Sequence, residues 1–230
     1  MVLADELSQQ VAEIFREGWS KRDGNVVPES ENLNLSNEAV ELDAVVLYAD
    51  IDESTALVDK MEAHFAAEVY KSFLHCAAKI IRSEGGTITA YDGDRIMAVF
   101  IGDTRTTSAV RSALKINYAR FNIINPAIKK QYPGNTYELR HAVGIDASKL
   151  FVTRTGVRGA NDLVWVGRAA NHAAKLCSLS ANYPTRITRE VYEKLENVAK
   201  ETKGMAMWEA LTWTGMGGRD IYQSNWTWSV

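Results

Sequence analysis

Two strongly apolar runs near the middle of the chain each have an aspartate at one end. The first run, VVLYA at residues 45–49, is followed by Asp50, and the second, IMAVF at residues 96–100, lies just after Asp94. Their β-branched and aromatic content predicts strands. A carboxylate beside a core is costly unless something positive compensates it. Two such carboxylates on neighbouring strands would form a hard-oxygen site for Mg²⁺ or Mn²⁺, and paired metal ions of this kind clamp phosphates during displacement reactions.

The composition is that of one sizeable globular domain with a short appendage. The chain has 230 residues, of which 46% are hydrophobic and 24% are charged. A net charge of −3 does not favour nucleic-acid binding. No apolar run approaches the roughly 20 residues that a membrane helix needs, and the first residues lack the apolar centre of a signal peptide. We therefore expect a cytoplasmic protein with no membrane association, with Cys76 and Cys177 as reduced thiols.

Apolar periodicity and turn residues predict an ordered series of elements. Helices are expected at residues 4–19, 63–82, 103–124 and 171–179. A further helix is expected to start at the turn 52–55, with Ser54 or Thr55 as its cap, and another to follow the strand at 186–188 and end at about residue 198. Strands are expected at 42–49, 139–145, 163–166 and 186–188, with hairpins around Asp92-Gly93 and within 205–228. Residues 21–38 are polar and turn-rich, which indicates a linker or extended arm. This order predicts an α+β domain with a ferredoxin-like, largely antiparallel sheet covered by helices on one face.

Four segments, in the same order along the chain, match one known family. They read ADIDEST at 49–55, YDGDRIMAVF at 91–100, VGID at 143–146 and VGRAANHAAKL at 166–176. In these segments the chain resembles the class III nucleotidyl cyclases, the catalytic domain of adenylate and guanylate cyclases, over roughly residues 42–225. Apolar periodicity and turn residues predict an N-terminal helix and extended arm at 1–40, and the resemblance implies a cyclase catalytic domain at 41–230.

The resemblance also implies which residues hold metal and phosphate. Asp50 and Asp94 match the two metal-binding carboxylates of the family, and the backbone carbonyl of Ile51 would be a further ligand. The implied cofactors are two Mn²⁺ or Mg²⁺ ions per site. The turn that follows opens a helix, so its N–H groups could hold the triphosphate of a nucleotide. The implied substrate-binding residues of this turn are Asp52, Glu53, Ser54 and Thr55.

Three further positions carry over from the family with departures. Asn171 matches the asparagine that positions the ribose. Lys175 stands where the family usually has an arginine that stabilises the transition state, and lysine keeps the charge but loses the bidentate fork. Arg219 is the candidate for the family's C-terminal phosphate-binding lysine, which is absent here. In this family the metal carboxylates come from one subunit, and the groups matched by Asn171 and Lys175 come from its partner, so an obligate homodimer with two equivalent sites is implied.

The positions that select the base differ most from the family. Adenylate cyclases tend to have lysine, and guanylate cyclases glutamate, where this chain has Ala90, which is followed by Tyr91. The second purine-reading residue is replaced by Val164, which is followed by Trp165. The added bulk favours a smaller base. In this pocket and in its short length the chain resembles the pyrimidine cyclases of bacterial Pycsar anti-phage systems, whose cyclic product activates a separate effector protein. UTP is therefore the favoured substrate, with cUMP as product, and CTP is next.

Several alternatives stay open at this point. The product could be cCMP or a purine cyclic nucleotide, or the domain could bind nucleotide without turnover, as the lysine at 175 and the missing C-terminal lysine suggest. A palm-like or diguanylate-cyclase-like domain is less favoured because its Gly-Gly-acidic-acidic hairpin is absent. Structural roles also compete: Asn171 could cap its helix, and Asp52 and Glu53 could be solvated acids at a helix start.

Overall fold

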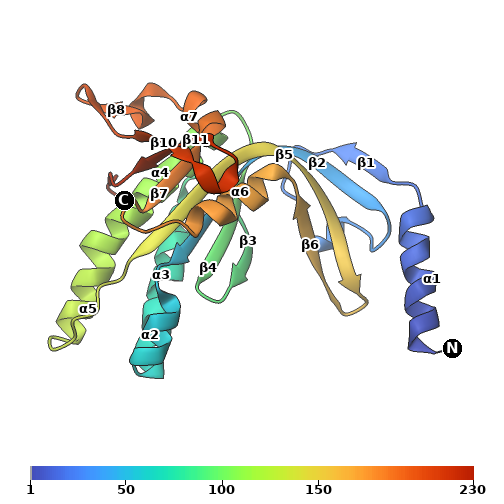
Figure 1. Ribbon diagram of the computed structural model, residues 1–230, viewed down its shortest axis with the longest axis horizontal. Coiled ribbons are helices and arrows are strands. Elements are labelled where there is room, and N and C mark those ends of the chain that lie inside the picture. The colour runs from blue at the N-terminus through green and yellow to red at the C-terminus, as the bar shows by residue number, and fades with distance from the viewer. Residues whose placement is uncertain (1) are drawn as a thin grey trace.

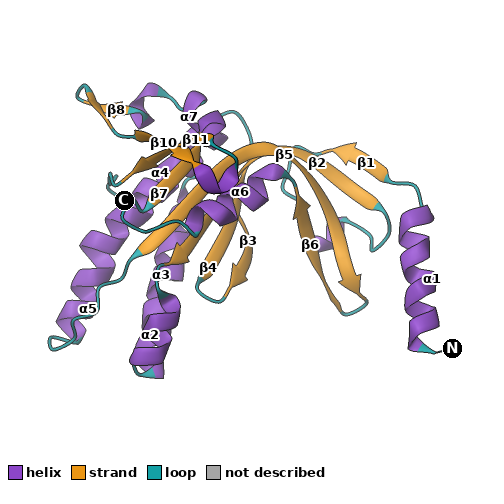
Figure 2. Ribbon diagram, in the orientation of Figure 1, coloured by secondary structure: helices purple, strands orange, loops and turns teal. Residues whose placement is uncertain are grey.

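One nine-stranded sheet forms the centre of the protein, which a computed structural model describes over residues 2–230 (Figures 1 and 2). The strand order is β10-β11-β7-β5-β2-β4-β3, while β1 pairs with β2 and β6 pairs with β5. Only the β1–β2 and β5–β7 pairs of this sheet are parallel, so the prediction of a largely antiparallel sheet is confirmed. The strands are β1 (Ser20–Asp23), β2 (Glu38–Ile51), β3 (Thr87–Asp92), β4 (Arg95–Phe100), β5 (His141–Val157), β6 (Ala160–Val166), β7 (Thr185–Thr188), β10 (Glu209–Trp213) and β11 (Arg219–Ser224), and a separate pair comprises β8 (Glu201–Thr202) and β9 (Met205–Ala206).

Helices cover both faces of this sheet, and not one face as the sequence predicts. Helices α3 and α4 pack on one face and α6 on the other. The helices are α1 (Leu3–Arg16), α2 (Ser54–Lys60), α3 (Ala63–Ser83), α4 (Arg105–Ala119), α5 (Asn125–Gln131), α6 (Arg168–Cys177) and α7 (Arg189–Glu193). A π-helical turn at Arg120–Ile124 joins α4 to α5, so the helix predicted to end near residue 124 continues to 131. Proline is tolerated in the first turn of α5 because the N–H groups there have no partner within the helix.

The apolar run of β2 explains why both faces are covered. Successive side chains of a strand point to opposite faces. Val45 and Leu47 therefore join the large cluster beneath α3 and α4, whereas Val46 joins a second cluster with Ala169 and Ala173 of α6. A strand that is apolar on both faces must be covered on both faces, because only then are all of its apolar side chains removed from water. The run thus fixes β2 as a central, doubly buried strand.

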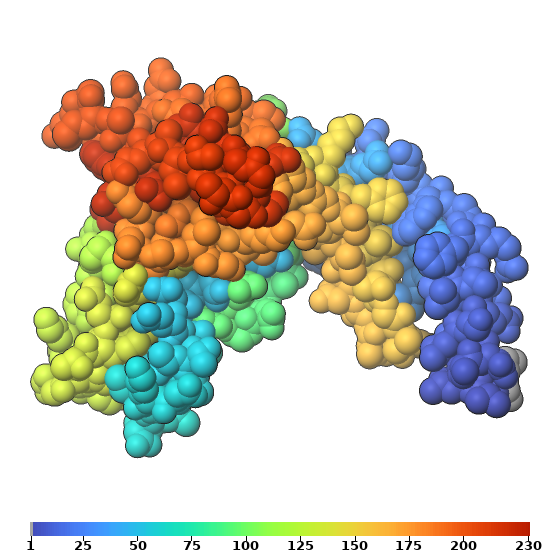
Figure 3. Space-filling model, in the orientation of Figure 1, coloured from blue at the N-terminus to red at the C-terminus, as the bar shows by residue number. Residues whose placement is uncertain are grey.

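Strands β2 and β5 extend beyond the body of the protein and form an arm with β1 and β6 (Figure 1). Both strands are longer than the sequence predicts, and the polar segment expected to be a linker contributes β1. Figure 3 shows the β5–β6 hairpin and the N-terminal segment projecting from the body, with the surface hollowed between them and the body. The cause of the extension is backbone pairing: each added strand satisfies the N–H and C=O groups of its neighbour.

Helix α1 lies at the end of this arm and buries none of its residues. Its direction is nevertheless fixed, because the buried Asn37 side chain donates to the Ile14 and Glu17 carbonyl oxygens at 2.8 and 2.9 Å. Just after the helix, the Trp19 ring lies edge-on to Phe151 with 4.9 Å between centroids. An amphipathic helix held in place with its apolar face exposed is a candidate contact surface.

A buried histidine at the start of β5 gives a prediction about acid stability. His141 is 1% exposed, neither ring nitrogen has a hydrogen-bond partner, and burial lowers its pKa to about 3. The unfolded chain takes up a proton near pH 6.5, which the native state does not, so this contribution to stability is present above pH 6.5 and is lost as the pH falls toward 3. For His141→Leu we expect the loss of unfolding free energy between pH 7 and pH 5 to shrink by about 2 kcal/mol.

Urea denaturation at the two pH values measures this difference. His64→Gln, at an exposed histidine of α3, is the matched control and should retain the wild-type pH dependence. If the pH dependence of the unfolding free energy in His141→Leu equals that of wild type, the prediction that buried His141 lowers acid stability is contradicted.

Candidate active site

The paired aspartates meet at one end of β2. Asp50 is the next-to-last residue of β2, and Asp94 lies in the tight β3–β4 turn, not on the following strand as predicted. Gly93 in this turn has φ of +62°, a conformation that favours glycine, as the hairpin prediction required. The adjacent Arg95 donates to Asp50 Oδ2 through both Nε and an η nitrogen, at 3.1 and 2.7 Å. The site is thus an acidic pair with one arginine.

The electrostatics of this pair leave negative charge incompletely compensated. Burial and the neighbouring Asp94 raise the pKa of Asp50, and the Arg95 guanidinium opposes that rise. Asp94 Oδ2 is buried and has no hydrogen-bond partner. Because a buried, unpaired carboxylate oxygen is costly, these two carboxylates fit a divalent cation as the missing partner. Within residues 2–230, no group of three or more His, Cys, Asp or Glu side chains could hold a metal, so backbone or substrate oxygens would have to complete the coordination.

The turn after Asp50 is built differently from the expectation. Helix α2 begins at Ser54 with Glu53 as its N-cap, and no side chain caps it, so neither Ser54 nor Thr55 has the predicted capping role. Glu53 adopts φ of +57°, a left-handed conformation that is uncommon outside glycine. Asp52 forms an ion pair with Arg140 at 3.3 Å, so it is not simply a solvated acid. The first-turn N–H groups of α2 are left without a side-chain acceptor, as a phosphate-binding turn requires.

Asn171 and Lys175 lie one turn apart on the exposed side of α6. The helix starts at Arg168 with Gly167 as its N-cap, so the alternative that Asn171 caps the helix is wrong. The Lys175 ammonium lies 3.4 Å from Met216 Sδ in the turn between β10 and β11. Both side chains are thus open to a ligand or to another chain.

The four positions expected near the base divide between two environments. Ala90 of β3 and Trp165 of β6 pack against the cluster beneath α6. Tyr91 and Val164, their neighbours in the chain, are 56% and 38% exposed. Because adjacent strand residues face opposite ways, the four side chains do not share one face of the sheet. Their contact with a base stays a prediction.

Arg219, the first residue of β11, lines a pocket with His172, and no residue of the acidic pair or of the turn after it lines that pocket. The structure also places two residues beside the pair that the sequence analysis missed. Arg95 bonds to Asp50, and the Tyr48 ring lies 6.0 Å from the Arg95 guanidinium. Spacing could have found both: Tyr48 is two residues before Asp50 and so shares its face, and Arg95 follows Asp94 directly.

Comparison with known proteins identifies the class and then the family. No protein-family model matches the chain. The crystal structure of the adenylyl cyclase CyaB from P. aeruginosa superposes with a TM-score of 0.69 at 22% identity, over 81% of this chain and 95% of that one. The fold is therefore that of a class III nucleotidyl cyclase domain.

The sequence relatives are more specific. The chain is 50% identical to a uridylate cyclase of Xanthomonas perforans and 52% identical to a uridylate cyclase of Burkholderia cepacia, and each comparison covers 100% of both chains. The chain belongs to this family of nucleotide cyclases, which confirms the resemblance found in the sequence. No helix within residues 2–230 combines the length and the apolar character needed to cross a membrane.

Proposed function

We propose that this enzyme converts UTP to 3′,5′-cyclic UMP and diphosphate. The observation that carries the proposal is the acidic pair, with its buried unpartnered Asp94 oxygen, in a chain related over its whole length to uridylate cyclases. In the reaction the ribose 3′-OH loses its proton, its oxygen bonds to the α-phosphorus, and the bond from that phosphorus to the α,β-bridging oxygen breaks. Diphosphate leaves with the electron pair of that bond.

In this proposal the acidic residues would bind metal ions, and backbone N–H groups would bind phosphate. Asp50, Asp94 and the Ile51 carbonyl would hold two Mn²⁺ or Mg²⁺ ions, which when bound favour ionisation of the 3′-OH and neutralise phosphate charge. The uncapped N–H groups at the start of α2, in the turn from Asp52 to Thr55, would hold phosphate oxygens.

The other groups would act on the sugar, the base and the growing charge. Asn171 would orient the ribose, and Lys175 would stabilise the charge that grows on the phosphate as the bond breaks. Ala90, Tyr91, Val164 and Trp165 would limit the base to a pyrimidine by size. All of these roles follow from the family resemblance and from the exposure of the α6 residues.

The active unit in this proposal is a homodimer in which each subunit completes the other's site. The exposed Asn171 and Lys175 would reach the acidic pair of the partner subunit, and the exposed apolar face of α1 supports a further contact between the copies. A mixing experiment tests this arrangement. Asp94→Ala and Asn171→Ala should each be inactive alone, whereas refolding them together in equal amounts should restore about a quarter of wild-type activity through one intact site per mixed dimer. No recovery despite subunit exchange would refute shared sites.

A product assay tests the substrate. The pure protein is incubated with Mn²⁺ and equal amounts of ATP, GTP, CTP and UTP, and the cyclic products are identified by mass spectrometry. We expect cUMP to dominate and Asp50→Ala to abolish it. A dominant cCMP peak would move the assignment to CTP, and cAMP or cGMP would show that the base positions do not select pyrimidines. Equal absence of product from wild type and Asp50→Ala would favour a nucleotide-binding module.

The biological role proposed here follows from the Pycsar resemblance. The cyclic nucleotide would act in the cytoplasm as a second messenger of anti-phage defence and would activate a separate effector protein. Loss of protection in cells that carry Asp94→Ala, with the effector present, would support this role, and full protection would refute it.

A further inference from the structure

A buried carboxylate lies on the α6 side of the sheet and takes no part in the proposed chemistry. Asp146 of β5 is 0% exposed and is the only buried acidic residue within residues 2–230. Ile145 and Ala147, its neighbours in the strand, belong to the cluster beneath α3 and α4, so the Asp146 side chain faces α6. Because a buried carboxylate is costly unless it is paired and hydrogen-bonded, the identity of its partners indicates what it does.

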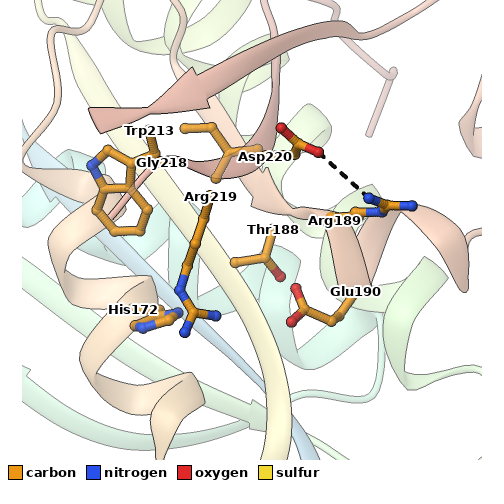
Figure 4. Close-up of a pocket in the computed structure, with 9 residues that line it drawn as sticks. His172, Thr188, Arg189, Glu190, Trp213, Gly218, Arg219 and Asp220 are labelled. Carbon is orange, nitrogen blue, oxygen red and sulfur yellow. Dashed lines mark hydrogen bonds and ion pairs between the residues drawn. The ribbon is translucent and has the colours of Figure 1, made fainter. Parts of the chain in front are cut away.

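Two of these partners are residues of α6. The guanidinium of Arg168, the first residue of the helix, lies 3.2 Å from Oδ2 of Asp146 through Nε and donates to Oδ1 at 3.3 Å through an η nitrogen. One turn later, His172 Nδ1 lies 3.2 Å from the same Oδ2. The hydroxyl of Thr188, at the end of β7, donates to Oδ1 at 2.6 Å, and Figure 4 shows this side chain and His172 lining one pocket. Burial raises the pKa of Asp146, and Thr188, Arg168 and His172 oppose that rise.

Further polar contacts fasten the same turn of α6 to its surroundings. Arg168 also donates to the Ala147 carbonyl oxygen at 2.6 Å and is paired with Glu190 of α7. The Ala169 N–H donates to the Ser148 hydroxyl oxygen at 3.0 Å. Hydrogen bonds and ion pairs of this kind are directional, so they fix the rotation of the helix as well as its distance from the sheet.

Apolar contacts alone would hold the rotation of α6 less firmly. The residues of this helix that pack in the second cluster are Ala169, Ala170 and Ala173. Such small side chains allow a close approach to the sheet, but they form only shallow ridges to interlock with it. The contacts of Asp146 therefore supply the rotational register of α6, which is the best attested use of a buried polar group.

The rotation of α6 decides where two exposed residues point. Successive helix residues turn by about 100°, so while His172 is directed at Asp146, the adjacent Asn171 is exposed. Lys175 lies one turn beyond Asn171 and is also exposed. A shift of the helix by about 1 Å would displace both residues, and a misplacement of that size can lower a reaction rate by about a hundredfold.

We propose that Asp146 is a positioning residue for the cyclase reaction, which fixes the rotation of α6 through Arg168 and His172 and thereby places Asn171 and Lys175. Asp146 is fully buried and contacts no substrate itself. This inference rests on the proposed function, which gives Asn171 and Lys175 their roles across the dimer interface.

Steady-state kinetics of Asp146→Asn test this role. The substitution keeps the size of the side chain and removes the negative charge beside Arg168 and His172. We expect kcat for cUMP formation to fall by about tenfold or more while KM for UTP changes by less than about threefold, because the groups proposed to hold metal and phosphate are untouched. Asp103→Asn, at an exposed aspartate after β4, is the matched control and should keep wild-type kinetics. Thermal unfolding checks that each variant is folded.

Mixed dimers assign the defect to one half of the shared site. Asp146 acts on the half that contributes Asn171, so Asp146→Asn refolded with an equal amount of Asp94→Ala should recover about a quarter of wild-type activity through one intact site. Refolded with Asn171→Ala, it should stay below about a tenth, because both substitutions then affect α6 and no intact site forms. A loss of stability alone would not produce this pattern.

Two results would overturn the positioning role. One is wild-type kcat in folded Asp146→Asn, and the other is no recovery with Asp94→Ala under conditions in which Asp94→Ala and Asn171→Ala do recover together. Failure of that reference pair as well would refute the shared site, and with it the role of α6 on which the positioning depends. His172→Gln leaves the Arg168 and Thr188 contacts of Asp146 in place and should give the same pattern, so it serves as the test if Asp146→Asn does not fold.

Discussion

Asp94→Ala should reduce formation of the cyclic product by about a thousandfold or more, because it removes one of two carboxylates available to hold the metal ions. The same substitution should leave the protein at least as stable as wild type in EDTA. Asp94 Oδ2 is buried without a partner, and the Asp94 charge helps raise the pKa of Asp50. Removing that charge relieves a like-charge contact, so activity and stability should move in different directions.

Activity with saturating Mn²⁺, Mn²⁺ binding by electron paramagnetic resonance, and thermal unfolding in EDTA measure the three parts of this prediction. Asp92→Ala is the matched control, since Asp92 is an exposed residue of the same hairpin. It should cost little activity. Wild-type turnover in Asp94→Ala would exclude the acidic pair as the metal site, and a large fall in stability would show that Asp94 is primarily structural.

Gly144→Ala should destabilise the fold by about 3 kcal/mol and lower activity as well. A Cβ atom at this position of β5 would lie 2.1 Å from the Ala173 carbonyl oxygen and 2.7 Å from Leu176 Cβ. The carbonyl oxygen belongs to the backbone of α6 and cannot turn aside as a flexible side chain could. The helix must therefore move off the sheet, and Asn171 and Lys175 move with it.

Urea denaturation and steady-state kinetics at low urea separate the two effects. Gly134→Ala is the matched control, since a Cβ atom there would meet nothing within 4 Å. Unchanged stability in Gly144→Ala would mean that α6 is not held as closely to β5 as the structure places it. Full activity in a destabilised variant would argue against the roles proposed for Asn171 and Lys175.

The parts of the fold that sequence predicted well are those encoded in short, contiguous segments. The apolar run of β2, the Asp92-Gly93 turn and the apolar face of α3 each depend on residues close together in the chain. The predictions that failed concern features that depend on packing between segments distant in the chain. The second helical layer formed because Gly144 lets α6 approach the sheet, and a single glycine in a strand carries no periodic signal.

The arm illustrates the same limit. The segment before β2 contains few apolar residues, so its composition indicated a linker. The structure pairs Ser20–Asp23 with β2 in parallel register, and the buried Asn37 amide fixes α1 from a position 20 residues or more along the chain. Backbone pairing of this kind depends little on side-chain type at an exposed edge, which is why composition alone misjudged it.

The sequence by itself determined the family, the acidic pair and the order of elements, because each depends on local motifs whose residue types are chemically constrained. Only the tertiary structure decided that Arg95 bonds to Asp50, and that His172 lies beside the buried Asp146 and lines one pocket with Arg219. These contacts join residues from different strands and helices. Their formation depends on how the two faces of the sheet are packed, and that packing is settled by the sum of many distant contacts that no single segment encodes.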